Sequence, residues 1–422
     1  MVRAKFHPRT GPIVTETDIG AAPPQVAFDG PRGPLFGLLV RNLLLTVVTL
    51  GIYRFWAKTR VRRFFWRHTK LLGEPLEYVG TGGELFVGFL IAIVILVPLS
   101  AIYSLLQFFT LGVPGVVPLA VDLAYYTIIL FLIQIAIHRM RRYRLTRTAW
   151  RGVRFGLDGS SVRYALISFG WGIATVLSLG LASPWLRVAT MRYFFNHARF
   201  GTAGLSLDAS ARWLFPRWLA VGAPFALSVA LYAALNWSVF AEIVALNARA
   251  QEGAEVGRAL SEAGARLVHW PLLFIVLGSI LGVWYSVVEF RYLLGRVTLG
   301  PVTLHAGIGT PFVYRVYVVF WGAVLASFLA LGGIMAAAGQ FGGGTGGPLA
   351  PALAGFIVLA FFLFIVLLGI LRTLFVDVTL LKRACATLTI GNPAALDDVL
   401  QASADLPGHG EGLADALDVG GF

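Results

Sequence analysis

Long uninterrupted apolar stretches dominate the hydrophobic pattern of this chain. Six of them are about 20 residues long, enough for a helix to cross roughly 30 Å of hydrocarbon. They are residues 85–109, 119–137, 215–234, 271–288, 313–337 and 353–371. The pattern predicts a mainly α-helical, polytopic membrane protein with about six transmembrane helices arranged as three hairpins.

Two further apolar segments, 35–52 and 162–181, are broken by polar or flexible residues. Arg41 interrupts the first, and Gly170 and Gly172 interrupt the second. If either crossed the membrane completely, the basic clusters on its two sides would face opposite compartments, against the positive-inside rule. We therefore expect both segments to be re-entrant or interfacial, with full crossing as the alternative.

Short stretches of alternating apolar and polar residues precede or follow the apolar segments. A period of two is typical of β-strands. The stretches are residues 27–30, 76–81, 155–160, 205–210, 302–305 and 388–392. Several end in a helix-capping residue, as where Thr81 and Glu84 form a capping-box pattern. We expect these short strands to pair into a small cytoplasmic sheet or barrel.

Composition and charge strengthen the membrane prediction and orient it. The chain has 57% hydrophobic and 13% charged residues, against about 25% charged in soluble domains. The net charge of +13 comes from basic clusters at 54–70, 139–154 and 187–217. Residues 110–116 carry no charge, and residues 247–269 are neutral. Basic connections belong in the cytoplasm, so nucleic acid is not needed as a partner.

The same argument predicts the placement of both ends of the chain. Residues 1–25 have no apolar signal-peptide core and are expected to be a flexible N-terminus, and residues 392–422 an acidic tail. Both termini are expected in the cytoplasm of a bacterium, with the protein in the inner membrane. The turns at 110–116, 247–269 and 339–347 are expected outside.

The chain repeats part of its own sequence. Adding 129 to the positions of one motif gives its second copy, and the pairs are Leu50 and Leu179, Gly51 and Gly180, Trp56 and Trp185, Arg63 and Arg192, and His68 and His197. The strand spacing extends the pattern to a degenerate third copy. A pseudo-threefold internal repeat is predicted, with units 26–138, 155–290 and 302–391.

One motif also carries a family resemblance. Residues 49–60 (TLGIYRFWAKTR) and 73–78 (GEPLEY) resemble the YjgN family of bacterial inner-membrane proteins. That family usually has Pro before the Trp, whereas this chain has Phe55 at the first copy and Pro184 at the second. The resemblance implies an inner-membrane location and a repeated architecture, and it implies no reaction, cofactor or catalytic residue.

Basic and aromatic residues share the helical segments that contain this motif. Such helices suit the membrane interface and anionic headgroups, although positive-inside anchoring with a packed apolar face is the simpler interpretation. The candidate lipid-binding residues are Arg54, Trp56, Lys58, Arg60, Arg63 and Arg67 in the first segment and Trp185, Arg187 and Arg192 in the second.

Two smaller groups complete the candidate sites. His68 and His197 belong to the repeat motif, but neither has a second ligand at helical spacing, so we predict no metal. Four polar residues lie within or close to apolar runs, where charge is a candidate functional feature. Hydration at the interface is the alternative for Asp122 and Glu242, and snorkelling to the cytoplasmic interface is the alternative for Arg41. They are Arg41, Asp122, Gln134 and Glu242.

The sequence contains no motif typical of an enzyme, so we predict neither catalysis nor a cofactor. Broken membrane segments and internal repeats favour the transport or handling of a lipid or amphiphilic solute. The alternative is a non-catalytic scaffold or accessory subunit that binds a membrane protein partner, such as a membrane protease. An intramembrane enzyme would require a cluster of polar residues that the sequence does not reveal.

Overall fold

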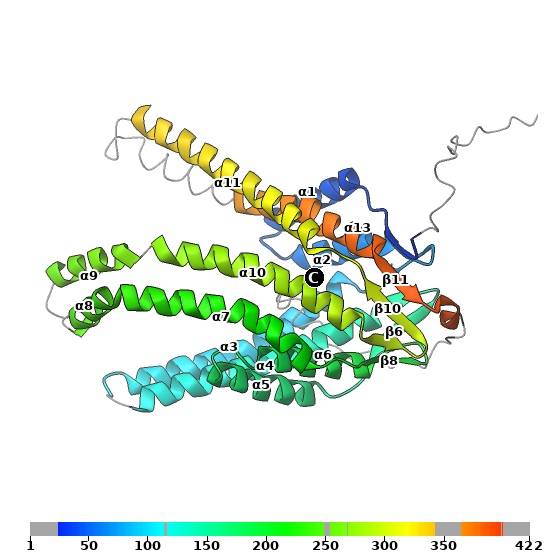
Figure 1. Ribbon diagram of the computed structural model, residues 1–422, viewed down its shortest axis with the longest axis horizontal. Coiled ribbons are helices and arrows are strands. Elements are labelled where there is room, and N and C mark those ends of the chain that lie inside the picture. The colour runs from blue at the N-terminus through cyan, green and yellow to red at the C-terminus, as the bar shows by residue number, and fades with distance from the viewer. Residues whose placement is uncertain are drawn as a thin grey trace, which may run out of the picture.

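Long helices extend from one end of the molecule, where all the strands gather (Figure 1). The computed structural model describes residues 24–113, 116–248, 254–267, 269–341, 364–397 and 399. Within these residues, six helices are long and apolar enough to cross a membrane. They are α3 (Gly82–Thr110), α4 (Val116–Thr146), α7 (Ala211–Leu235), Val276–Leu294 in α10 (His269–Leu294), Thr310–Ala330 in α11 (Thr310–Phe341), and Phe364–Ala386. The chain is therefore mainly helical, as a polytopic membrane protein requires.

The two interrupted apolar segments form the outgoing arms of helical hairpins. Helix α1 (Arg32–Val48) turns into α2 (Arg54–Arg67), and α5 (Ser161–Leu177) turns into α6 (Ser183–His197). The strands that flank each hairpin pair antiparallel with each other, β1 (Val26–Phe28) with β2 (Thr69–Leu71) and β6 (Val153–Leu157) with β7 (Ala198–Phe200). Each hairpin therefore leaves and re-enters the strand end of the molecule at adjacent points.

The two hairpin turns have the same geometry. Leu50 and Leu179 adopt left-handed backbone angles, with φ of 48° and 50°. The N–H groups of the glycines that follow reach back to the carbonyls of Thr46 and Thr175, each at 2.7 Å. This is a Schellman motif in which Leu occupies the position that usually belongs to Gly. Leu50 is 94% exposed and Leu179 is 95% exposed.

The strands form a meander in which each strand pairs with its neighbours in sequence. Eight of them follow the order β11-β10-β9-β8-β7-β6-β5-β4, and a second sheet has the order β1-β2-β3. The strands are β1 (Val26–Phe28), β2 (Thr69–Leu71), β3 (Glu74–Pro75), β4 (Glu77–Tyr78), β5 (Thr148–Trp150), β6 (Val153–Leu157), β7 (Ala198–Phe200), β8 (Ala203–Leu207), β9 (Val297–Leu299), β10 (Val302–Ala306) and β11 (Leu388–Gly391). Six of them coincide with the predicted alternating stretches.

Gln25 joins the free edges of the two sheets. Its backbone carbonyl accepts a hydrogen bond from the N–H of Leu72 at 2.7 Å. Its side-chain oxygen accepts one from the N–H of Ile390 in β11, at 2.5 Å. On the other side, the N–H of Leu76 donates to the carbonyl of Thr69 at 2.9 Å. Edges joined in this way leave fewer unpaired backbone groups.

A shared hydrophobic core lies inside this arrangement of strands. Trp150 of β5, Phe200 of β7 and Ile390 of β11 belong to one buried cluster, together with Leu35 of α1 and Val378 of the helix Phe364–Ala386. Trp150 is 1% exposed and is the largest fully buried side chain among the described residues. Strands from three distant parts of the chain therefore wrap around one core, like a small barrel.

One predicted connection is a helix in the structure, and part of another lies outside the described residues. Residues 247–269 were expected to be a loop, but α9 (Ala254–Leu267) occupies most of them and packs on α8 (Trp237–Ala248). An amphipathic helix satisfies its own backbone hydrogen bonds and gathers its charged residues on one face. One of these residues, Arg266, pairs with Glu242 of α8. Of the glycine-rich turn, residues 342–347 lie outside the described residues, as do residues 1–23 and 400–422.

Candidate functional site

Four of the basic and aromatic candidates on α2 and α6 contact the start of the next long helix or the residues just before it. Arg63 donates to the carbonyl of Gly80 at 2.8 Å, and Arg192 donates to that of Ala209. Trp56 and Trp185 pack against Phe86 and Phe215 at the start of the next long helix, with ring centroids 5.9 and 5.1 Å apart. These four residues therefore attach each hairpin to the helix that follows it.

The remaining candidates on α2 include both exposed and partly buried side chains. Arg54, Arg60 and Arg67 are exposed, and Lys58 is partly buried. The Arg60 guanidinium lies 5.4 Å from the Tyr53 ring centroid. Arg62, which also belongs to the basic cluster, is only 1% exposed and donates to the Tyr78 hydroxyl at 3.4 Å. The cluster is therefore not a uniformly exposed basic surface.

His68 and His197 make the same local contact. The Nδ1 atom of His68 lies 2.8 Å from the Phe64 carbonyl, and that of His197 lies 2.7 Å from the Tyr193 carbonyl. Their backbone carbonyls accept the N–H groups of Asp29 and Asp158. No group of three metal-ligating side chains occurs within the described residues. Both histidines therefore close the last turn of a helix.

Ion pairs follow these histidines at matching positions. Lys70 Nζ lies 2.7 Å from Asp29 Oδ2, and Arg199 Nε lies 3.1 Å from Asp158 Oδ2. The hydrogen bond from Lys70 lowers the pKa of the Asp29 carboxyl. These pairs join the first strand of each hairpin to the last one.

The four polar residues near the apolar runs have different environments. Arg41 is exposed on α1. Asp122 accepts a hydrogen bond from Tyr103 at 2.8 Å and another from Gln107, which links α4 to α3. Glu242 pairs with Arg266 of α9 at 3.0 Å. Gln134 lines a cavity beside α5 that has both polar and apolar side chains in its lining.

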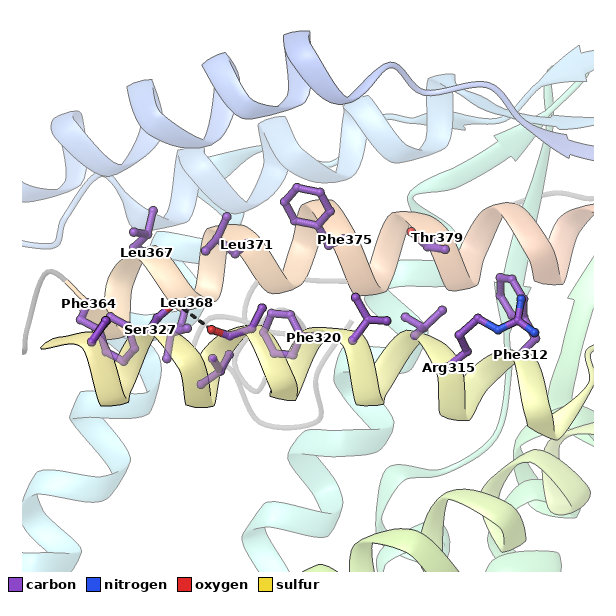
Figure 2. Close-up of a pocket in the computed structure, with 15 residues that line it drawn as sticks. Phe312, Arg315, Phe320, Ser327, Phe364, Leu367, Leu368, Leu371, Phe375 and Thr379 are labelled. Carbon is purple, nitrogen blue, oxygen red and sulfur yellow. Dashed lines mark hydrogen bonds between the residues drawn. The ribbon is translucent and has the colours of Figure 1, made fainter. Parts of the chain in front are cut away.

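A large apolar groove runs between α11 and the helix Phe364–Ala386, with a volume of about 1070 Å³. Figure 2 shows Phe364, Leu367 and Ser327 at one end, and Phe312 and Arg315 at the other, toward the strands. Apolar side chains from both helices fill the length between them. Its shape suits a long apolar chain with a polar group at the strand end.

Three arginines lie at or near the strand end of this groove. Arg315 lines it directly. Arg32 of α1 donates to the Thr379 hydroxyl at 2.8 Å and to the Leu374 carbonyl at 3.2 Å. The Arg383 guanidinium lies 5.5 Å from the ring centroid of Phe312. The groove is therefore apolar along its length and positively charged at one end.

A π-helical turn, Thr373–Asp377, forms part of this end of the groove. Phe375 of this turn lines the groove, and the Leu374 carbonyl receives Arg32. π-helical turns are rare and occur often at functional sites. Neither this turn nor Arg32 was among the sequence candidates. Arg315 was visible in the sequence as a charge within the apolar run 313–337, but it was not singled out.

Comparisons with known proteins agree with this membrane architecture. A protein named Inner membrane protein YjgN from Salmonella typhimurium is 29% identical over 155 residues, which are 36% of each chain. The protein of the same name from Escherichia coli K12 is 26% identical over 170 residues, 40% of this chain and 39% of the relative. The matched segments thus cover less than half of these relatives. No solved structure matches the chain significantly.

A family model covers far more of the chain. The model described as "Bacterial protein of unknown function (DUF898)" matches residues 23–416. This range includes every strand and all six long apolar helices. The chain therefore belongs to the DUF898 family of bacterial proteins, and the resemblance to YjgN inner-membrane proteins predicted from residues 49–60 is correct.

Proposed function

We propose that this protein binds an anionic lipid in the groove between α11 and the helix Phe364–Ala386, and handles or moves it within the inner membrane. The observation that carries the proposal is the apolar groove of about 1070 Å³ that ends beside Arg315, Arg32 and Arg383. An acyl chain would lie along the apolar length, while the headgroup would meet the arginines.

The selectivity of this groove depends on its charged end. Each methylene group buried in the groove contributes about 0.8 kcal/mol relative to water, but a chain that is already in the bilayer gains little from this transfer. Selectivity must then come from the headgroup end, where each basic residue contributes about 1 kcal/mol toward an anionic lipid. Three arginines are enough to enrich anionic over zwitterionic lipid.

The proposed orientation puts the strand end of the molecule in the cytoplasm. The basic segments 54–70 and 139–154 run into the strands at this end, as α2 into β2 and α4 into β5, in agreement with the positive-inside rule. The hairpin of α5 and α6 reaches only part of the way along α7, because the Gly180 carbonyl accepts the indole N–H of Trp218 at 2.9 Å. Trp218 is seven residues into α7, about 10 Å from its start. We propose that both hairpins are re-entrant, with Leu50 and Leu179 in lipid.

The internal repeat is also supported by contacts at matching positions. The turn geometry, the arginine bonds to Gly80 and Ala209, and the histidine bonds all recur 129 residues apart. We propose that residues 26–138 and 155–290 are two copies of one unit, and that 302–391 is a third with a longer helical insertion.

Single-cysteine labelling tests the proposed topology. In a Cys385→Ser background, Arg67→Cys should react with a membrane-impermeant maleimide only after the cytoplasmic side is opened, whereas Leu111→Cys should react in intact spheroplasts. Leu50→Cys and Leu179→Cys should resist the reagent from both sides, because both turns are proposed to lie in hydrocarbon. Labelling of Leu179→Cys from the outside would instead mean that α5 crosses the membrane completely.

Lipid analysis of purified variants tests the groove. Ala323→Trp places a bulky side chain in the groove, and Arg315→Gln removes a charge at its end. Each should reduce co-purified anionic lipid by at least half, as measured by quantitative mass spectrometry. Val318→Trp, on the same helix but outside the groove lining, and Arg291→Gln on α10 are the matched controls. Equal lipid content in all four variants, with a stoichiometric co-purified protein, would favour the scaffold alternative.

A further inference from the structure

A second cavity, lined by polar as well as apolar side chains, lies among α4, α5, α6, α7 and α10. Its volume is about 420 Å³, and it shares no lining residue with the apolar groove. The polar side chains that line it include Gln134, Arg141, Tyr164, Ser168, Arg187 and Glu289. Gln134 precedes the end of α4 by 12 residues, about 18 Å along the helix axis. The cavity therefore brings polar groups between α4, α7 and α10, which are long enough to cross a membrane, and the hairpin of α5 and α6. Polar groups among such helices are candidate functional features.

Arg141 gives this cavity an excess positive charge. Its guanidinium donates to the Tyr164 hydroxyl at 3.2 Å and lies 5.6 and 5.3 Å from the ring centroids of Tyr164 and Phe194. Within the described residues it has no acidic partner. The carboxylate that lines the same cavity, Glu289, pairs with Arg187 instead. One guanidinium therefore faces the cavity without a counter-ion.

Ser168 provides a second, independent indication of a ligand. Its side chain lines the cavity and is 4% exposed, yet its hydroxyl has no hydrogen-bond partner within the described residues. Buried hydroxyl groups are nearly always paired. The amide of Gln134 and the hydroxyl of Tyr164 line the same space. Several hydrogen-bond donors thus surround one uncompensated cation.

We propose that this cavity binds a phosphate group, with Arg141 as its counter-ion and the hydroxyls of Tyr164 and Ser168 and the amide of Gln134 as further donors. Guanidinium groups bind phosphate through paired, charge-assisted hydrogen bonds. A phosphodiester carries one negative charge, which Arg141 neutralises. The phosphate belongs either to a lipid headgroup or to free phosphate. This proposal does not depend on the groove beside α11.

Calorimetric titration of the purified full-length protein in a neutral detergent tests the proposal and separates the two sources. One titration uses inorganic phosphate, and a second uses dihexanoyl phosphatidylglycerol. Arg141→Gln should weaken binding at least tenfold, whereas Arg139→Gln, an exposed residue of α4 outside the cavity lining, should leave it unchanged. Binding of inorganic phosphate identifies a solute site, and binding of the lipid alone identifies a headgroup site.

A second variant tests the same cavity without removing Arg141, in case Arg141→Gln does not fold. Gly172 lines the cavity within α5, and a Cβ added there meets no atom within 4 Å. Gly172→Leu should fill the cavity while improving helix propensity, and should also weaken binding at least tenfold. Unchanged binding in both variants, or no binding of either ligand to the wild-type protein, would overturn the proposal. If lipid binding is lost in Ala323→Trp but kept in Gly172→Leu, the lipid binds in the groove beside α11, and this result would also overturn the proposal of a phosphate site in the cavity.

Discussion

Replacing Trp150 by alanine is expected to lower the free energy of unfolding by about 3–5 kcal/mol. Trp150 is 1% exposed and lies at the centre of the core that β1, β7, β10 and β11 share. Its ring lies 5.7 Å from that of Phe200, and its removal leaves a cavity that short strands cannot close. The change should appear as a lower midpoint in SDS titration of the detergent-solubilised protein.

Two comparison variants separate this packing effect from a general loss of aromatic residues. Trp237→Ala removes a tryptophan that is 71% exposed and should change stability by less than about 0.5 kcal/mol. Trp150→Phe keeps an aromatic ring and removes an indole N–H that has no partner within the described residues, so it should cost much less than the alanine variant. A small effect of Trp150→Ala would mean that the strands do not enclose a common core.

Leu85→Ala and Leu214→Ala should each cost about 2–5 kcal/mol. Both leucines are 0% exposed, in the first turns of α3 and α7, and they lie 129 positions apart. Leu85 packs with Phe55 and Tyr143, and Leu214 packs with Val188 and Leu293. If the two parts of the chain are copies of one unit, the two losses should agree within about 1 kcal/mol, as measured by the same titration.

The same helices supply matched controls. Leu90 and Leu219, also 129 positions apart, are 44% and 39% exposed. Their replacement by alanine removes the same atoms from a surface that lipid or detergent covers, so each should cost far less than its buried counterpart. A large loss at Leu85 with a negligible one at Leu214 would argue against equivalent units.

The two candidate binding regions make different demands on a ligand. The groove beside α11 offers length and apolar surface, with positive charge confined to one end. The cavity beside Arg141 is smaller and offers hydrogen-bond donors around one cation. Because they share no lining residue, variants at Ala323 and at Gly172 report on them separately.

Much of the architecture was predictable because it depends on residues that are close in sequence. Apolar stretches of about 20 residues predicted the long helices, although residues 353–363 of the sixth stretch, 353–371, lie outside the described part of the chain. Alternation of period two predicted six of the strands. Strands β2, β3, β5, β7 and β9 were missed. Each is two or three residues long, and no longer alternating stretch with a capping residue marks it, as one marks the equally short β1 and β4. Their place is set by antiparallel pairing with the neighbouring strands.

Both ligand-binding proposals rest on contacts that no local pattern contains. The groove exists because α11 and Phe364–Ala386 lie side by side, and Arg32 reaches it from more than 300 positions earlier in the chain. The cavity combines side chains of five helices, so Gln134 and Arg187 could be named individually but not recognised as neighbours. The hydrophobic pattern of the sequence specifies which segments enter the membrane. Helix packing specifies which polar side chains become neighbours there, because contacts between helices join residues that are distant along the chain.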